Sequence, residues 1–129
     1  MEFVKGFRDL EVYKLARQLS KEIFEISLKF PKEEMYSFTD QVRRSSRSVG
    51  AQIAEAWAKR RYQKHFVSKL TDAVGEELET QHWIEVAQDC AYLSPQTSTG
   101  ILEKYDTLGK MLNSMINKSA SFCEKSTAD

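Results

Sequence analysis

Turn-forming residues are scarce in this sequence, with only 5 glycines and 2 prolines among 129 residues. Folds built from many strands and turns need more of these residues, so their scarcity favours an all-helical protein. The length suits one domain, and we expect residues 1–129 to form it.

Cysteine is also rare, and Cys90 and Cys123 stand far apart in the chain. They lack CxxC spacing, which argues against a metal knuckle and a disulfide scaffold and fits a reducing compartment. There is no run of about 18 apolar residues, and the first residues lack the apolar core of a signal peptide. We therefore expect a cytoplasmic protein that does not enter a membrane.

The residue patterns of common catalytic sites are missing too. There is no recognisable Ser-His-Asp or Cys-His arrangement and no glycine-rich phosphate loop. Carboxylate di-metal bundles use a Glu-x-x-His element on each of two helices, whereas here it occurs once, from Glu79 to His82. We expect no catalytic residue, no metal site and no cofactor, so a metal-dependent enzyme is the least favoured hypothesis.

Apolar residues instead recur at spacings of three and four, the pattern of amphipathic helices. Pro31 ends the first helical run, and Ser94 with Pro95 supplies the N-cap and first position of the last one. The predicted helices cover residues 9–30, 34–60, 62–92 and 95–122, followed by a frayed tail at 124–129. Four such helices with short connections predict an antiparallel up-down-up-down four-helix bundle.

The inward stripe of these helices contains polar as well as apolar residues. In the second helix it starts at Met35 and includes Ser45 and Ser46, and in the third it includes Glu77 and Gln81. We expect Glu77 and Gln81 to be buried, with the serines of the second helix or an arginine as partners of the carboxylate. The expected role of Glu77 is to fix the register between helices rather than to catalyse a reaction.

Positive and negative charges are equal in number, 19 of each, but they are segregated along the chain. Residues 43–64 hold seven basic residues and one acid, whereas residues 72–89 hold six acids and no lysine or arginine. A local basic patch can bind phosphates, and Trp57 and Tyr62 could stack on bases. The predicted nucleic-acid-binding residues are Arg43, Arg44, Arg47, Lys59, Arg60, Arg61 and Lys64. The alternatives are pairing with the acidic helix of a neighbouring subunit and a solvated surface.

The predicted first and second helices both carry apolar or small residues away from their core stripes. Small side chains let another helix approach closely, and two outer apolar faces are more than a monomer should expose. We therefore predict a homo-oligomer, with contact inside one bundle as the alternative. The predicted interface residues are Tyr13, Phe24 and Leu28 on the first helix and Gly50, Ala51, Ala54, Glu55 and Ala58 on the second.

Several motifs occur in an order that resembles a known family. They are FRDLEVY at residues 7–13, FPKEEMYS at 30–37, QVRR at 41–44 leading to Ile-Ala-Glu at 53–55, and ELET at 77–80. This pattern is similar to the four-helix bundle proteins encoded in intervening sequences of bacterial 23S ribosomal RNA genes. Those proteins are in turn similar to the accessory protein of diversity-generating retroelements, a pentameric bundle that binds nucleic acid and a reverse transcriptase.

The chain departs from the family pattern at three places. Gln52 stands where asparagine is usual, Ala56 where glycine is usual, and Ala73-Val74 where a Gly-Ser pair is expected. Alanine is the better helix former, so these changes put a sharp bend after Glu55 in doubt but not the fold.

The resemblance and the basic segment together favour one function over one remaining alternative. It is a self-associating, pentameric accessory protein that binds RNA or single-stranded DNA without sequence preference, with a reverse transcriptase as a candidate protein partner. The alternative is a structural or protein-interaction oligomer that binds no nucleic acid and uses its arginines between subunits.

Overall fold

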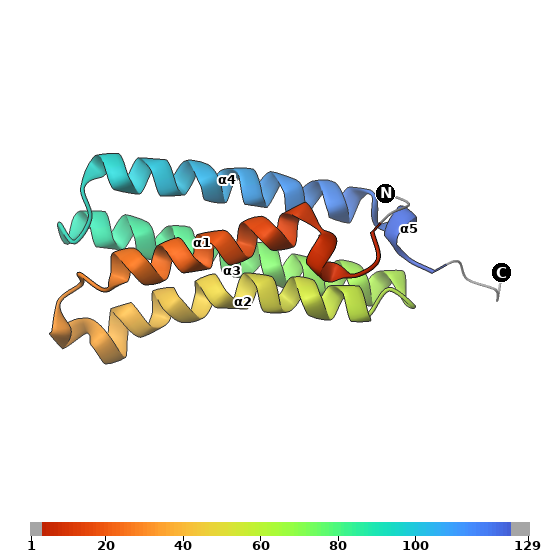
Figure 1. Cartoon of the computed structure of the whole chain (residues 1–129), viewed down its shortest axis with the longest axis horizontal. Coiled ribbons are helices and arrows are strands. Elements are labelled where there is room, and N and C mark those ends of the chain that lie inside the picture. Colours follow the sequence, from red (N-terminus) through yellow and green to blue (C-terminus); the bar gives the residue numbers. More distant parts are fainter. Residues whose placement is uncertain (1–3, 125–129) are drawn as a thin grey trace.

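The computed structural model describes residues 4–124, which form helices and connections with no strand among them. A 3-10 turn, η1 (Phe7–Asp9), precedes the first long helix. The helices are α1 (Glu11–Ser27), α2 (Asp40–Ala58), α3 (Gln63–Asp89), α4 (Pro95–Asn117) and the single turn α5 (Ser119–Phe122). Figure 1 shows the four long helices side by side along the molecule, with their connections at alternate ends. The predicted all-helical class is confirmed for the described residues.

The core lies between the four long helices, each of which packs against two others. Its fully buried side chains include Leu19 of α1, Ile53 of α2, Phe66 of α3 and Leu108 of α4. Burying one such side chain stabilises the fold by roughly 1.5–3 kcal/mol, so these stripes hold the helices together. None of the described helices is long and apolar enough to cross a membrane.

The first connection is longer than predicted. Pro31 is followed by a 3-10 turn at Lys32–Glu34 and a π-helical turn at Met35–Thr39, so α2 begins at Asp40 rather than at residue 34. The wider winding of a π turn changes the angle between successive side chains. Met35 is 40% exposed, so the prediction that it points inward is wrong. The π turn is the physical reason.

The other helix ends differ from the prediction by a few residues. The predicted start of α4 is confirmed. Pro95 is its first residue, and the Ser94 hydroxyl accepts a hydrogen bond from the Thr97 amide at 3.2 Å. However, α3 ends at Asp89 instead of residue 92, because Ala91 has a φ of 61° and closes the helix with the left-handed conformation. The predicted last helix is divided into α4 and α5. Apart from Glu124, the predicted frayed tail lies outside the described residues.

Candidate functional site

The connection between α2 and α3 carries the largest local concentration of positive charge, and we call residues 59–64 the basic corner. It lies at the end of the molecule that also carries α5 (Figure 1). The Tyr62 amide donates to the carbonyl of Lys59 at 3.0 Å, which closes a tight turn before α3. Lys59, Arg61 and Lys64 are exposed and form no ion pair with any residue between 4 and 124. Three cations are therefore presented to solvent from one short segment.

The aromatic residues at the basic corner differ in accessibility. Tyr62 is 58% exposed, and its ring centroid lies 5.3 Å from that of His65. Trp57, in contrast, is covered by Arg60, whose guanidinium carbon lies 3.7 Å from the Trp57 ring centroid. The Arg60 Nε also donates to the Trp57 carbonyl at 2.9 Å. Tyr62 is thus available for stacking on a base, whereas the side chains of Arg60 and Trp57 pack against each other.

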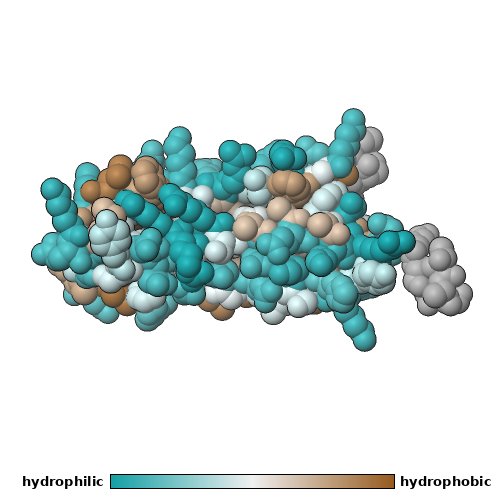
Figure 2. Space-filling model, turned by 90° about the horizontal axis from the view of Figure 1, so that it is seen from below, coloured by the Kyte–Doolittle hydropathy of each residue, from teal (hydrophilic) through white to brown (hydrophobic). Residues whose placement is uncertain are grey.

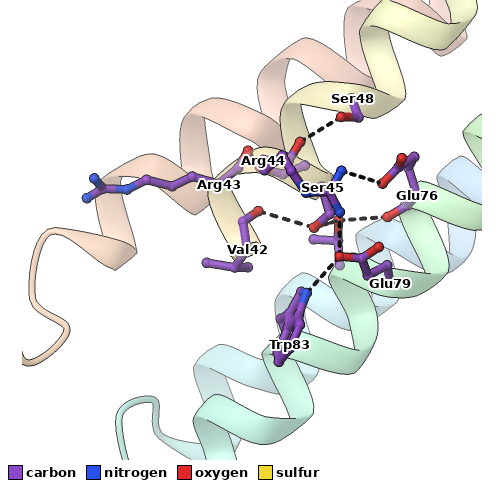
Figure 3. Close-up of polar contacts among 10 residues, drawn as sticks. Val42, Arg43, Arg44, Ser45, Ser48, Glu76, Glu79 and Trp83 are labelled. Carbon is purple, nitrogen blue, oxygen red and sulfur yellow. Dashed lines mark hydrogen bonds and ion pairs between the residues drawn. The ribbon is translucent and has the colours of Figure 1, made fainter. Parts of the chain in front are cut away.

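Arg44 faces the acidic helix α3 of its own chain. Its Nη2 lies 2.6 Å from Oε2 of Glu79, and its Nη1 lies 3.5 Å from Oε1 of Glu76 (Figure 3). The Trp83 indole N–H donates to the same Glu79 oxygen at 3.0 Å, and together with Arg44 it holds the pKa of Glu79 below its ordinary value. The bond to Glu79 raises the pKa of Arg44 in return. Part of the segregated charge is therefore neutralised within one chain.

Arg43 and Arg47 turn towards α1 instead. Figure 3 shows Arg43 extending away from α3, and its Nε donates to the Ser27 hydroxyl at 2.7 Å. The guanidinium carbons of Arg43 and Arg47 lie 4.9 and 5.8 Å from the Phe24 ring centroid, within the range of cation–π attraction. The predicted nucleic-acid-binding residues of α2 therefore lie on two sides of the helix, Arg44 towards α3 and Arg43 and Arg47 towards α1. None of the three is adjacent in sequence to the basic corner.

A groove of about 250 Å³ lies where α1, α2 and η1 meet. Its lining combines small, aromatic and basic side chains, namely Phe7, Tyr13, Ala16, Arg17, Ser20, Arg47, Gly50, Ala51 and Ala54. A Cβ atom at Gly50 would lie 3.6 Å from the ring of Tyr13, so part of the small-residue face serves packing within the chain. Ala51 and Ala54 leave the groove open above this contact.

Four of the predicted interface residues, Tyr13, Gly50, Ala51 and Ala54, line this groove, and the other four are not part of its lining. Phe24 and Leu28 of α1 are 38% and 63% exposed. Ala58 is exposed at the end of α2, and Glu55 forms an ion pair with Lys69 of α3 at 3.0 Å. On the face seen in Figure 2, apolar surface gathers in two areas, one near the left end and one right of the middle, with hydrophilic side chains between them.

Glu77 is buried as predicted, with 2% of its surface exposed, but its expected partners are wrong. It accepts a hydrogen bond from Gln81, which is half-buried rather than buried as predicted, whereas Ser45 bonds to Thr80 at 2.8 Å. Because α3 turns this carboxylate towards α4, Glu77 lies against Gly109, where a Cβ atom would be 2.7 Å from Oε2. Burial raises the pKa of Glu77, and the charge of Asp106 raises it further.

Sequence reasoning missed two contacts that position these surfaces. The pairing of Arg44 with Glu76 and Glu79 could have been suspected from the acidic run at residues 72–89. The space for Glu77 could have been suspected from Gly109, a glycine inside a helical pattern. Both contacts depend on how the packed helices are rotated relative to each other. The spacing of residues along one helix does not give that rotation.

The Glu-x-x-His element does not form a metal site in the structure. No group of three or more His, Cys, Asp or Glu side chains suited to a metal ion occurs between residues 4 and 124. Glu79 is engaged by Arg44 and Trp83, and His82 is exposed with its ring beside Trp83 at 4.8 Å.

Comparison with known proteins gives one family and a solved relative. Residues 8–114 match the model of the 23S rRNA-intervening sequence protein family. The chain is also similar to a protein of unknown function from the S23 ribosomal protein family of Bacteroides thetaiotaomicron, whose crystal structure is known. The two share 25% sequence identity and a TM-score of 0.74 over 82% of this chain and 95% of the other. No curated protein matches the chain. The family model spans most of the chain, and the protein belongs to the 23S rRNA-intervening sequence protein family.

Proposed function

We propose that this protein is an antiparallel up-down-up-down four-helix bundle that self-associates and holds nucleic acid at its basic corner. The observation that carries the proposal is the exposure of Lys59, Arg61 and Lys64 without acidic partners among residues 4–124. Flexible cations of this kind contact phosphates and do not read base sequence. Tyr62 adds an exposed ring on which an unpaired base can stack.

Self-association supports the same function by repeating the corner. One corner offers few phosphate contacts, but linked copies bind one strand with a high effective concentration of sites. The groove and the exposed Phe24 and Leu28 supply apolar area for such an assembly. The resemblance to a pentameric accessory protein leads us to propose five subunits, and the alternate connections in Figure 1 support the antiparallel order.

The test is a fluorescence titration of labelled single-stranded RNA and DNA at low salt. Arg61→Ala/Lys64→Ala removes two cations from the corner, and Lys29→Ala/Lys32→Ala removes two exposed lysines near the opposite end as a matched control. We expect the corner variant to bind at least tenfold more weakly than the control variant. The absence of binding by the unaltered protein would defeat the proposal, and so would equal loss in both variants.

The alternative, a structural oligomer without nucleic-acid binding, is favoured by one observation. Arg44 is already paired within the chain, and Arg43 is engaged by Ser27 and Phe24, so these arginines stabilise the subunit. If the protein assembles but binds no strand at low salt, this alternative replaces the proposed function.

A further inference from the structure

We infer that copies of this chain join head to tail, with the outer side of α3 around Leu78 of one copy seated in the α1–α2 groove of the next. The inference rests on the proposed self-association and specifies its contact. It concerns two different surfaces of the same chain, so that every copy uses both.

The outer side of α3 presents an apolar residue that its own bundle does not cover. Leu78 lies in the middle of the helix with 55% of its surface exposed, and Val74, one turn earlier, is only half-buried. Residues four and seven apart share a side of a helix, so Val74, Leu78 and Glu85 form one stripe. Leucine in such a position gains free energy when a partner covers it.

The groove has the size and the floor to receive this side chain. Its volume of about 250 Å³ exceeds that of a leucine side chain, and Ala51 and Ala54 offer apolar contact without filling it. Missing side-chain volume on α2 allows a helix to approach closely, as it does for Tyr13 at Gly50. The groove therefore fits a narrow apolar ridge such as the one at Leu78.

The charges around the two surfaces are complementary. Arg17 and Arg47 border the groove, both are exposed, and neither forms an ion pair with another residue between 4 and 124. Glu85 shares the stripe of Leu78. Asp106 lies three residues before Gly109 on α4, so it shares the side of α4 on which Gly109 contacts Glu77 of α3. Both acids are exposed and have no cationic partner among the described residues.

A symmetric contact of groove with groove fits less well. It would place Arg17 and Arg47 of one copy against the same residues of the other, and facing like charges disfavour association. It would also leave Leu78 exposed to water. A head-to-tail contact avoids both costs and builds a closed ring or an open filament, according to the rotation between copies.

The experiment uses two variants of the full chain that each damage one surface. Leu78→Arg damages the ridge, and Ala51→Arg, at an exposed position, blocks the groove. We expect each variant alone to have the light-scattering mass of one chain. An equimolar mixture joins the intact groove of the first to the intact ridge of the second, so we expect a mass of two chains.

Controls separate this inference from the proposed function. Circular dichroism confirms folding, and Thr107→Arg, at an exposed position of α4, should assemble like the unaltered protein. If Leu78→Arg keeps the full assembly, or if the mixture remains at the mass of one chain, the head-to-tail contact is wrong. A single-chain mass for the unaltered protein at every concentration would overturn the proposed self-association as well.

Discussion

Glu77 shows how a single residue links α3 and α4 and, as a buried carboxylate, also lowers the stability of their packing. Its carboxylate is buried between α3 and α4, has Gln81 as its hydrogen-bond partner and lies near the charge of Asp106. No basic side chain between residues 4 and 124 forms an ion pair with it. The space for it exists because α4 has a glycine at residue 109.

The raised pKa of Glu77 predicts a loss of stability as pH rises. The unfolded chain releases this proton near the ordinary value of 4.5, whereas the folded protein retains it to higher pH. Stability from the protonated form is therefore complete below 4.5 and is lost as pH rises through the folded pKa. We expect Glu77→Gln to be more stable than the unaltered protein by roughly 1 kcal/mol at neutral pH, as measured by urea unfolding. Equal pH profiles for the two proteins would refute this assignment.

The contact at Gly109 predicts opposite effects for two glycines of α4. A Cβ atom at Gly109 would lie 2.7 Å from Oε2 of the buried Glu77, whereas one at Gly100 meets nothing within 4 Å. Gly100→Ala should stabilise by up to about 1 kcal/mol through helix propensity. Gly109→Ala should destabilise by about 1–2 kcal/mol, because the Glu77 carboxylate is buried and bonded to Gln81, and displacing it outweighs the same gain. Thermal unfolding of both variants tests the pair, and a stabilised Gly109→Ala would contradict the contact.

At the scale of the helices, prediction succeeds where a local signal marks a boundary. Ser94 and Pro95 specify the start of α4 by capping and by a fixed φ, and both act within a few residues. The π turn at 35–39 has no comparable signal, so Met35 was misplaced. The position of the basic corner between α2 and α3 can be predicted because its residues follow one another in the sequence. The division of Arg43, Arg44 and Arg47 between α1 and α3 depends on how three helices pack.

The end of α3 offers a test at this scale. Ala91 adopts a φ of 61°, a conformation that costs a residue with a Cβ atom about 1 kcal/mol and costs glycine almost nothing. Because Ala91 is exposed, Ala91→Gly removes little packing. We expect this variant to gain roughly 1 kcal/mol in unfolding free energy, measured with guanidinium. A destabilised variant would mean that the α3–α4 connection does not have this backbone geometry.

At the scale of the whole molecule, a net charge of zero conceals two kinds of cation. Arg44 and Lys69 are paired with acids inside the chain, whereas the exposed cations of the basic corner have no acidic partner among the described residues. The order of charges along the sequence shows the segregation, but only packing shows which charges remain available. We therefore propose phosphate contact for the basic corner and structural roles for Arg43 and Arg44.

The most direct test of phosphate contact at the corner is the dependence of single-stranded RNA affinity on salt. The slope of log affinity against log salt is negative, and each phosphate contact adds about 0.7 to its magnitude for a single strand. We predict that Arg61→Ala/Lys64→Ala reduces this magnitude by about 1.4 for each corner engaged by the strand, while Lys29→Ala/Lys32→Ala leaves it unchanged. A slope that is the same in the unaltered protein and the corner variant would contradict the account.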